Sequence, residues 1–268
     1  MQTYKTFYPT SAPKVGSLLL VHGAGEHIGR YAWAIEQWNR AGYDVLGGDL
    51  PGYGRSSGKQ KGHIDRFEAY IEAVADWYEE LRCRDSVPPY LFGHSLGGLV
   101  IARFLETHQP IVRGVVLSSP CFGLSVKVPP WKQSLAKALN VVYPKLTLGS
   151  EIDSHLVTRN EQIIKRDETD PYLIKKASVR WYNELLLHMQ LNWQQLDRIP
   201  QIPLLVHQAG GDRITDKSET KKWVEQLPIG QKWYREWPGL YHEVLNEPER
   251  AQVIQEMINW MGRIETTK

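Results

Sequence analysis

The chain has 268 residues, 42% of them hydrophobic, and a formal net charge of +2 at pH 7. This length and this apolar content suit one α/β domain with an insertion. Basic and acidic residues are interspersed, which excludes the clustered basic face of a nucleic-acid-binding protein, so no nucleic-acid partner is expected. The two cysteines, Cys83 and Cys121, are too few for a disulfide framework and are expected to be unpaired thiols in a reducing compartment.

The start of the chain contains no apolar segment typical of a signal peptide. No apolar run along the chain approaches the ~20 residues that are needed to span a bilayer. We therefore expect a cytoplasmic protein.

Apolar runs and turn-forming residues alternate along most of the chain. Strands are expected, the first of them weakly alternating and at a sheet edge, at residues 3–8, 15–21, 43–49, 90–92, 114–120, 202–208 and 232–237. Helices are expected, from apolar residues at helical spacing, at residues 31–40, 66–81, 99–106, 217–226 and from 247 onward. Strands that alternate with helices in this way predict a doubly wound, mostly parallel sheet.

The alternation breaks between residues 122 and 188, where no convincing parallel strand is found. The apolar spacing there predicts one amphipathic helix around residues 135–143 and another over residues 179–189. We therefore expect an inserted helical cap at residues 122–188, on a core formed by residues 1–121 and 189–268.

The pentapeptide Gly93-His94-Ser95-Leu96-Gly97 lies between an expected strand and an expected helix. In this context a G-x-S-x-G string predicts a nucleophile elbow, a strained turn that exposes the serine hydroxyl at the top of the sheet. The flanking residues must be glycines, because a Cβ there would make strand and helix collide with the turn. Ser95 is therefore the candidate nucleophile.

A serine nucleophile needs a base, and the base needs a carboxylate that orients it. In this type of sheet the acid and then the base follow the serine in chain order, on loops after later strands. Asp212 and His242 satisfy this rule. Asp216 is the near alternative acid but fits better as a helix N-cap, and Glu243 adjoins His242 too closely for a good imidazole contact. His94 is expected to point away from the serine.

The oxyanion of a tetrahedral intermediate must meet preset N–H donors, and the loss of one donor typically costs about 2.7–4 kcal/mol. One donor is expected to be the backbone N–H of Leu96, and the other that of Ala24 in the glycine loop at residues 22–25. This loop does not match a dinucleotide-binding loop, because Gly29 comes one residue too late for G-x-G-x-x-G. With no P-loop lysine and only scattered histidines, neither a cofactor nor a metal is expected.

Four short strings resemble the monoacylglycerol lipase and lysophospholipase family of the α/β-hydrolase fold: H-G-A-G-E-H at 22–27, G-H-S-L-G-G at 93–98, G-D-R at 211–213 and Y-H at 241–242. The similarity covers nearly the whole chain, and some segments look closest to bacterial lysophospholipase-like members. It implies a triad of Ser95, Asp212 and His242, an oxyanion hole from Ala24 and Leu96, and a cap over an acyl-chain tunnel. The chain departs from many relatives in carrying Leu96 in place of methionine, and in a cap rich in charged residues.

The cap is expected to enclose a mostly apolar pocket. The candidate lining residues, each equally compatible with the cap's own core, are Phe122, Leu124, Val126, Leu139, Val142, Leu146, Leu148, Ile152, Leu156, Leu185 and Leu186. Trp131 and Tyr143 lie near several lysines, Lys127, Lys132, Lys137 and Lys145. Aromatic residues beside lysines suit a bilayer surface, so transient, peripheral membrane contact through the cap is one hypothesis; an ordinary amphipathic helix is the simpler one.

Together these features predict a serine ester hydrolase that cleaves a single-chain lipid ester to a free fatty acid through an acyl-enzyme. Monoacylglycerol and lysophospholipid fit almost equally well as its substrate. Two alternatives stay open: a binding protein that holds a small ligand on a hydrolase scaffold, and a general carboxylesterase, acyltransferase or peptidase of the same fold.

Overall fold

The computed structural model describes residues 2–58, 60–126, 129–149 and 153–266. A seven-stranded sheet has the order β1-β3-β2-β4-β5-β8-β9. Its strands are β1 (Lys5–Tyr8), β2 (Gly16–Val21), β3 (Tyr43–Gly48), β4 (Tyr90–His94), β5 (Gly114–Ser118), β8 (Leu204–Ala209) and β9 (Lys232–Trp237). The edge strand β1 pairs with β3 in the antiparallel sense and every other pairing is parallel. The predicted doubly wound, mostly parallel α/β sheet is confirmed.

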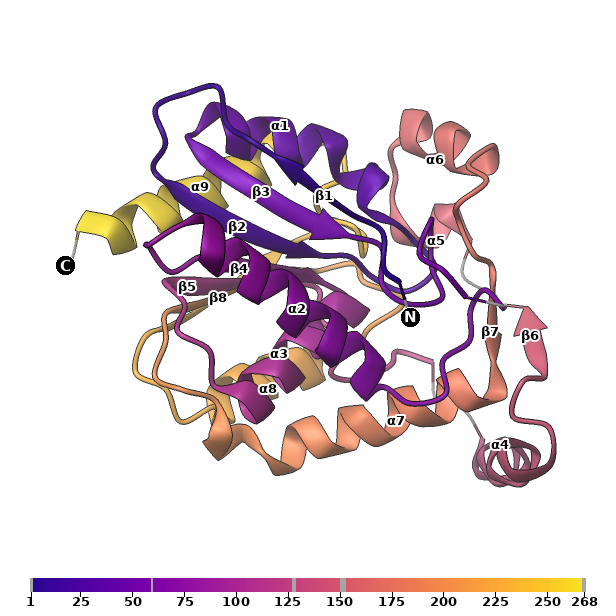
Figure 1. The fold of residues 1–268 in the computed structure, drawn as a ribbon. Helices are drawn as coiled ribbons and strands as arrows, with labels where there is room; N and C mark the ends of the chain where they lie inside the picture. The colour runs from indigo at the N-terminus through magenta and orange to yellow at the C-terminus, as the bar shows by residue number, and fades with distance from the viewer. Residues whose placement is uncertain (1, 59, 127–128, 150–152, 267–268) are drawn as a thin grey trace.

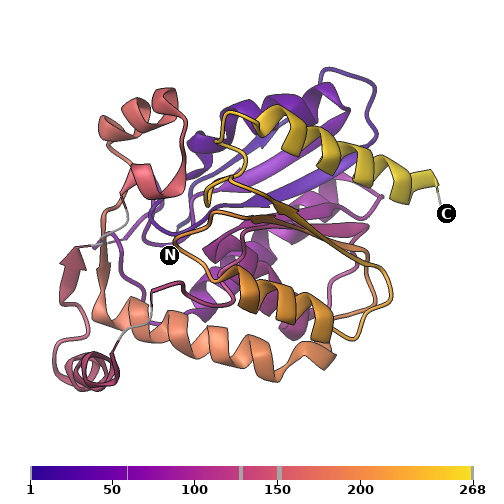
Figure 2. The same ribbon diagram turned by 180° about the vertical axis from the view of Figure 1, so that it is seen from behind.

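Helices cover both faces of this sheet (Figure 1). One face carries α1 (Ala32–Arg40), which follows the short 3-10 helix η1 (Ile28–Tyr31), and α9 (Arg250–Thr266). The other face carries α2 (Glu68–Arg84), α3 (Leu96–His108) and α8 (Lys217–Gln226), as the view from behind also shows (Figure 2). The apolar core is accordingly divided into two clusters, one on each side of the sheet.

The central strand β4 shows why its sequence is apolar throughout. Leu91 packs into the cluster beneath α2 and α3, whereas Tyr90 and Phe92 pack into the cluster beneath α1 and α9. Successive side chains of a strand point to opposite faces, so a strand with helices on both faces is buried at every position. Ser95 follows the carboxyl end of β4, at the end of the sheet that faces the insertion.

The segment between β5 and β8 forms the insertion. Its elements are α4 (Pro130–Val142), β6 (Thr147–Gly149), α5 (Ser154–Val157), α6 (Glu161–Glu168), β7 (Lys176–Ser178) and α7 (Val179–Gln194), followed by the 3-10 helix η2 (Leu196–Arg198). The two short strands β6 and β7 pair with each other in the antiparallel sense, and the expected helices correspond to α4 and α7. Because α7 continues to Gln194, the predicted boundary at residue 188 falls inside a helix, and the division into core and cap stays a prediction.

Helices α4 to α6 and the strands β6 and β7 lie beyond one end of the sheet, whereas α7 runs back along the helices on one of its faces (Figure 1). The insertion is joined to loops of the core by several hydrogen bonds. Ile174 donates its backbone N–H to the carbonyl oxygen of Gly25 (2.8 Å), and Ser178 donates to that of Gly62 (2.8 Å). The indole N–H of Trp181 on α7 donates to the hydroxyl of Tyr70 on α2 (3.0 Å). The insertion is thus fixed to the rest of the molecule by directional contacts, including one to the glycine loop that carries Ala24.

Cys83 is exposed and Cys121 is buried, and neither takes part in a disulfide. In the part of the chain that the structure describes, no helix has the length and the apolar character needed to cross a membrane.

Candidate active site

The turn after β4 holds Ser95 in a strained conformation. Its backbone angles are φ 50° and ψ −115°, a region that non-glycine residues rarely occupy and that costs of the order of 1–3 kcal/mol. A Cβ on Gly93 would lie 2.6 Å from the carbonyl oxygen of Gly97, and a Cβ on Gly97 would collide with that of Val21. Glycine at these two positions therefore lets the start of α3 pack against the ends of β4 and β2 and form this turn, as the sequence analysis expected.

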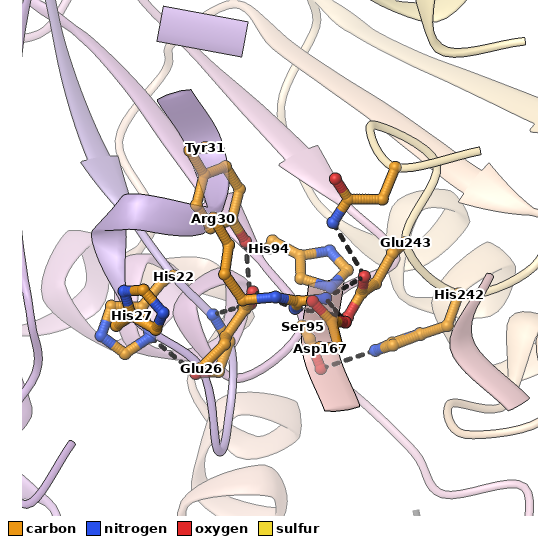
Figure 3. A network of polar contacts seen from close by, with 12 residues as sticks. His22, Glu26, His27, Arg30, Tyr31, His94, Ser95, Asp167, His242 and Glu243 are labelled. Atoms are coloured by element: carbon orange, nitrogen blue, oxygen red, sulfur yellow. Dashed lines mark hydrogen bonds and ion pairs between the residues drawn. The ribbon is translucent and has the colours of Figure 1, made fainter. Parts of the chain in front are cut away.

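Two loops bring further polar side chains to Ser95. His242, on the loop after β9, places its Nε2 2.9 Å from Ser95 Oγ. Asp212, on the loop after β8, places its Oδ2 2.8 Å from the Nδ1 of His242. Ser95 and His242 can be followed in Figure 3. Three side chains from distant parts of the sequence thus form one continuous hydrogen-bonded chain, the geometry of a nucleophile, a base and an orienting acid.

Asp212 is held by more than the imidazole. Its Oδ1 accepts the backbone N–H groups of Ile214 (2.8 Å) and Thr215 (2.9 Å). Burial would raise the pKa of Asp212, but His242 and these hydrogen bonds outweigh it and lower the pKa. Burial would likewise lower the pKa of His242, but the Asp212 carboxylate outweighs it and raises the pKa above its usual value. The acid is therefore ionised, and the imidazolium form of the base is stabilised.

The alternatives to this set are bound to other partners. Asp216 is the N-cap of α8 and accepts the backbone N–H of Ser218 (2.9 Å). The Glu243 carboxylate faces Arg30. His94 has its Nδ1 3.0 Å from the carbonyl oxygen of Ser118. Burial, reinforced by the neighbouring His242, lowers the pKa of His94 to about 4.

The two expected oxyanion donors border the same space. Leu96 is the first residue of α3, so its N–H has no partner within the helix. Ala24 is exposed in the glycine loop after β2, and both residues line the cavity above Ser95. The loop is held by Glu26, whose Oε1 accepts the backbone N–H of Gly23 (2.5 Å) and the hydroxyl of Tyr31 (2.8 Å).

A cavity of about 280 Å³ opens between the core and the cap, and Ser95 and His242 lie in its wall. This volume is close to the lower end for small-molecule sites, roughly 300–1,000 Å³. Most of its lining is apolar and comes from the insertion and neighbouring loops: Leu124, Val157, Leu173, Ile174, Ala177, Trp181, Tyr182, Leu185 and Ile214. The polar part of the wall comes from Ser95, its neighbours in the core, and charged or polar residues of the insertion: Asp153, Ser154, Asp167, Lys175 and Lys176.

Two of the expected pocket residues, Leu124 and Leu185, line this cavity. Phe122 does not, because it is turned into the core, where its ring packs 4.2 Å from that of Trp223. The other described candidates also lie outside the lining, with Val126, Val142, Leu146 and Leu148 exposed to solvent and Leu139, Leu156 and Leu186 half-buried. Ile152 lies outside the described residues.

The cavity wall also contains a buried ionic cluster around Arg30, which the sequence analysis missed. The Arg30 guanidinium contacts the carboxylates of Glu26 (2.8 Å), Glu243 (2.7 Å) and Asp167 (2.5 Å), as Figure 3 shows. Burial would raise the pKa of Glu243, but Arg30 outweighs it and lowers the pKa to about 2. Asp167 belongs to α6, so this ionic cluster joins the cap to the core. In the sequence, only the spacing of four residues between Glu26 and Arg30 pointed to an ion pair of this cluster.

The sheet order, the strained serine turn and the Ser95–His242–Asp212 contacts define the molecule as an α/β-hydrolase. The family model Hydrolase_4, described as "Serine aminopeptidase, S33", matches residues 12–249. The chain is 41% identical over 256 residues to the phospholipase YtpA of Bacillus subtilis, covering 95% of this chain and 96% of that protein. It is 25% identical to a monoacylglycerol lipase of Mycolicibacterium smegmatis, covering 96% of this chain and 91% of that protein.

Among solved structures, a monoacylglycerol lipase of Paleococcus ferrophilus superposes with a TM-score of 0.89 and 34% identity, over 98% of this chain and all (100%) of that one. These matches extend over nearly the whole length of both proteins. The chain therefore belongs to the monoacylglycerol lipase and lysophospholipase family of α/β-hydrolases. It is a carboxylic ester hydrolase of that family's type.

Proposed function

We propose that this protein hydrolyses esters of single-chain lipids, with Ser95 as the nucleophile, His242 as the general base and Asp212 as the orienting acid. The observation that carries the proposal is the hydrogen-bonded chain from Ser95 Oγ to His242 Nε2 (2.9 Å) and from His242 Nδ1 to Asp212 (2.8 Å). The apolar cavity above this chain supports a lipid acyl group as the part of the substrate that is held.

In the proposed mechanism, His242 accepts the proton of the Ser95 hydroxyl while Oγ attacks the ester carbonyl carbon. The resulting oxyanion accepts hydrogen bonds from the N–H groups of Leu96 and Ala24. The imidazolium, stabilised by Asp212, then gives its proton to the leaving glycerol or glycerophospho oxygen. Water, activated by the same imidazole, attacks the acyl-enzyme and releases the fatty acid with the free serine.

The substrate class rests on the cavity and on the relatives. The cavity above Ser95 is mostly apolar, which suits the acyl chain of a lipid ester. Among the relatives, one is named a phospholipase and others are named monoacylglycerol lipases. We therefore propose monoacylglycerol and lysophospholipid as substrates, with glycerol or glycerophosphate derivatives as the leaving groups.

We also propose that the cap makes transient contact with a membrane surface. Trp131 is 64% exposed and Val141 82% exposed on α4, and further exposed apolar side chains lie on or near this helix: Val126, Leu135, Val142, Tyr143, Leu146 and Leu148. Lys137 and Lys145 are exposed within the same segment. A large exposed apolar surface beside lysines is typical of an interfacial segment on anionic lipid.

A fluorophosphonate probe tests the catalytic proposal. The wild-type protein should form a covalent adduct at Ser95, and Ser95→Ala should lose both the adduct and the esterase activity. Ser86→Ala, at an exposed serine, is the matched control and should keep both. An unlabelled wild type, or an unchanged esterase rate in Ser95→Ala, would favour a ligand-binding protein instead.

Substrate class is tested by a chain-length series of monoacylglycerols and lysophospholipids, with proline peptides as the comparison. We expect turnover of the lipid esters, and preferential peptide cleavage would contradict the proposal.

Membrane contact is tested by co-sedimentation with vesicles of phosphatidylglycerol and phosphatidylcholine. The double change Val141→Glu with Val142→Glu should reduce binding, whereas Ile111→Glu, at a site 70% exposed before β5, should not. Equal binding of all three proteins would argue against docking through the cap.

A further inference from the structure

Three side chains with metal-binding atoms meet between α2 and α7, outside the cavity above Ser95. They are Glu68 at the start of α2 and Glu184 and His188 on α7. One ligand atom from each lies within 4.8 Å of those of the other two. None of the three lines the cavity above Ser95, so the proposed hydrolysis gives them no role.

His188 is the unusual member of this group. It is only 1% exposed, yet neither of its ring nitrogens has a hydrogen-bond partner among the residues that the structure describes. Its Nε2 lies 3.4 Å from Glu68 Oε1, which is longer than an ordinary N–H···O hydrogen bond. Buried polar groups are normally satisfied, so the ring nitrogens of His188, which lie beside two carboxylates, are available as metal ligands.

The surroundings hold these groups in place. The His188 ring stacks on that of Phe67, with centroids 4.2 Å apart and planes 14° from parallel. Glu184 Oε2 accepts the backbone N–H of Phe67 (2.9 Å), which fixes Glu184 against the first turn of α2. Glu184 and His188 are one helical turn apart and share one face of α7. The N-terminal end of α2 lies beside α7 (Figure 1).

We propose that Glu68, Glu184 and His188 bind one divalent transition-metal ion of the zinc class. An imidazole nitrogen favours such ions over Mg²⁺ and Ca²⁺. Glu68 and Glu184 supply two carboxylates, of which Glu184 also lies 3.8 Å from the Arg180 guanidinium. Zinc binds nitrogen and oxygen at about 2.0–2.2 Å, which places two ligand atoms of a tetrahedral site about 3.4 Å apart. The 3.4 Å between His188 Nε2 and Glu68 Oε1 matches this separation. The side chain of Glu68 is 49% exposed, which leaves room for water to complete the coordination.

The proposed ion would connect two parts of the molecule. Helix α7 also carries Trp181 and Leu185, which form part of the cavity wall, whereas α2 belongs to the layer that covers the sheet. A metal held between them fastens α7 to the core. Its effect is therefore on stability and on the position of the cavity wall, and the reaction at Ser95 needs no metal step.

The test is zinc binding by the full chain after treatment with a chelator, measured by isothermal titration calorimetry and by the metal content after dialysis. Wild type should bind one Zn²⁺ and melt at a higher temperature with it. Glu68→Gln and Glu184→Gln should each weaken binding by about tenfold or more, since even outer partners of metal ligands cost about 10–100-fold. Gln at position 184 keeps an oxygen for the Phe67 N–H, so that variant should still fold.

Glu72→Gln is the matched control, because Glu72 is an exposed carboxylate on the same helix α2. Melting curves in chelator establish that each variant is folded before metal is added, and His188→Gln adds a third ligand change. The proposal is overturned if wild type binds no Zn²⁺, or if the Glu68 and Glu184 variants bind it as tightly as the Glu72 control.

Discussion

Replacement of Arg30 by methionine tests whether the buried ionic cluster stabilises the fold. The change removes the charge and keeps an unbranched apolar side chain, and it leaves the carboxylates of Glu26, Glu243 and Asp167 buried without their shared cation. Breaking a buried ion pair by removing one partner typically costs about 3–5 kcal/mol. Glu243 alone gives a similar figure, because a pKa lowered from 4.5 to about 2 corresponds to about 3 kcal/mol at about 1.4 kcal/mol per pKa unit.

The pH dependence of this loss has a definite sign. In the wild type the folded pKa of Glu243 lies below the unfolded value, so its stabilisation is complete above pH 4.5 and is lost as the pH falls towards 2. Without Arg30, burial and like charges raise the pKa of Glu243, so the variant loses stability as the pH rises above 4.5. The difference between the two proteins should therefore be larger at pH 7 than at pH 5.

Urea denaturation at these two pH values measures the free energy of unfolding of both proteins. Arg40→Met is the matched control, because Arg40 makes an exposed ion pair with Glu36 and should change stability by less than about 1 kcal/mol. The reasoning is refuted if Arg30→Met costs no more than the control, or if its cost is the same at both pH values.

Four further substitutions and a pH profile test other parts of the structure. Gly97→Ala should prevent the serine turn from forming, because its Cβ would meet carbonyl oxygens at the end of β2. The control Gly262→Ala meets nothing and should stabilise α9 by about 0.5–1 kcal/mol. Melting temperature and esterase rate are measured for both, and an active, stable Gly97→Ala variant would contradict the reasoning. In the proposed mechanism the neutral form of His242 is the base. Because the Asp212 carboxylate outweighs burial and raises the pKa of His242, the acid limb of kcat/KM should have its midpoint above 6.5, and activity should rise with pH through it. Asp212→Asn should lower kcat by about 10⁴-fold. An acid-limb midpoint at or below pH 6.5 in the wild type, or a much smaller loss of kcat in Asp212→Asn, would count against these roles. Phe122→Ala should cost about 3–5 kcal/mol in unfolding experiments because the ring packs in the core, and a change in acyl-chain preference without a loss of stability would show that it lines the pocket.

The sheet and the serine turn could be predicted because their signals are local. The turn at Ser95 needs only neighbouring glycines between a strand and a helix, all within one short stretch. Asp212 and His242 could be found because the order of a doubly wound sheet limits where an acid and a base can return to the serine. In both cases the sequence position alone determines which loop the residue occupies.

The pocket and the ionic cluster depend on packing, which periodicity does not specify. Leu185 lines the cavity and its neighbour Leu186 does not, because one step along a helix turns a side chain by about 100°. Arg30 and Asp167 look like ordinary surface charges in the sequence, since only the docking of the cap buries them together. The direction in which an apolar or charged side chain points therefore depends on how its helix packs against other elements.

The backbone hydrogen bond from Ile174 to Gly25 links the insertion directly to the loop that presents Ala24. Gly25 has a φ of 78°, and a Cβ there would lie 2.9 Å from the Ile174 carbonyl oxygen, so the two backbones meet without intervening side chains. If the substrate is a lipid ester as proposed, we expect a shift of the insertion by its acyl chain to move this loop as well. The acyl-chain length of the substrate should then alter kcat as well as affinity, because binding of the chain and alignment of the ester carbonyl depend on the same backbone contact.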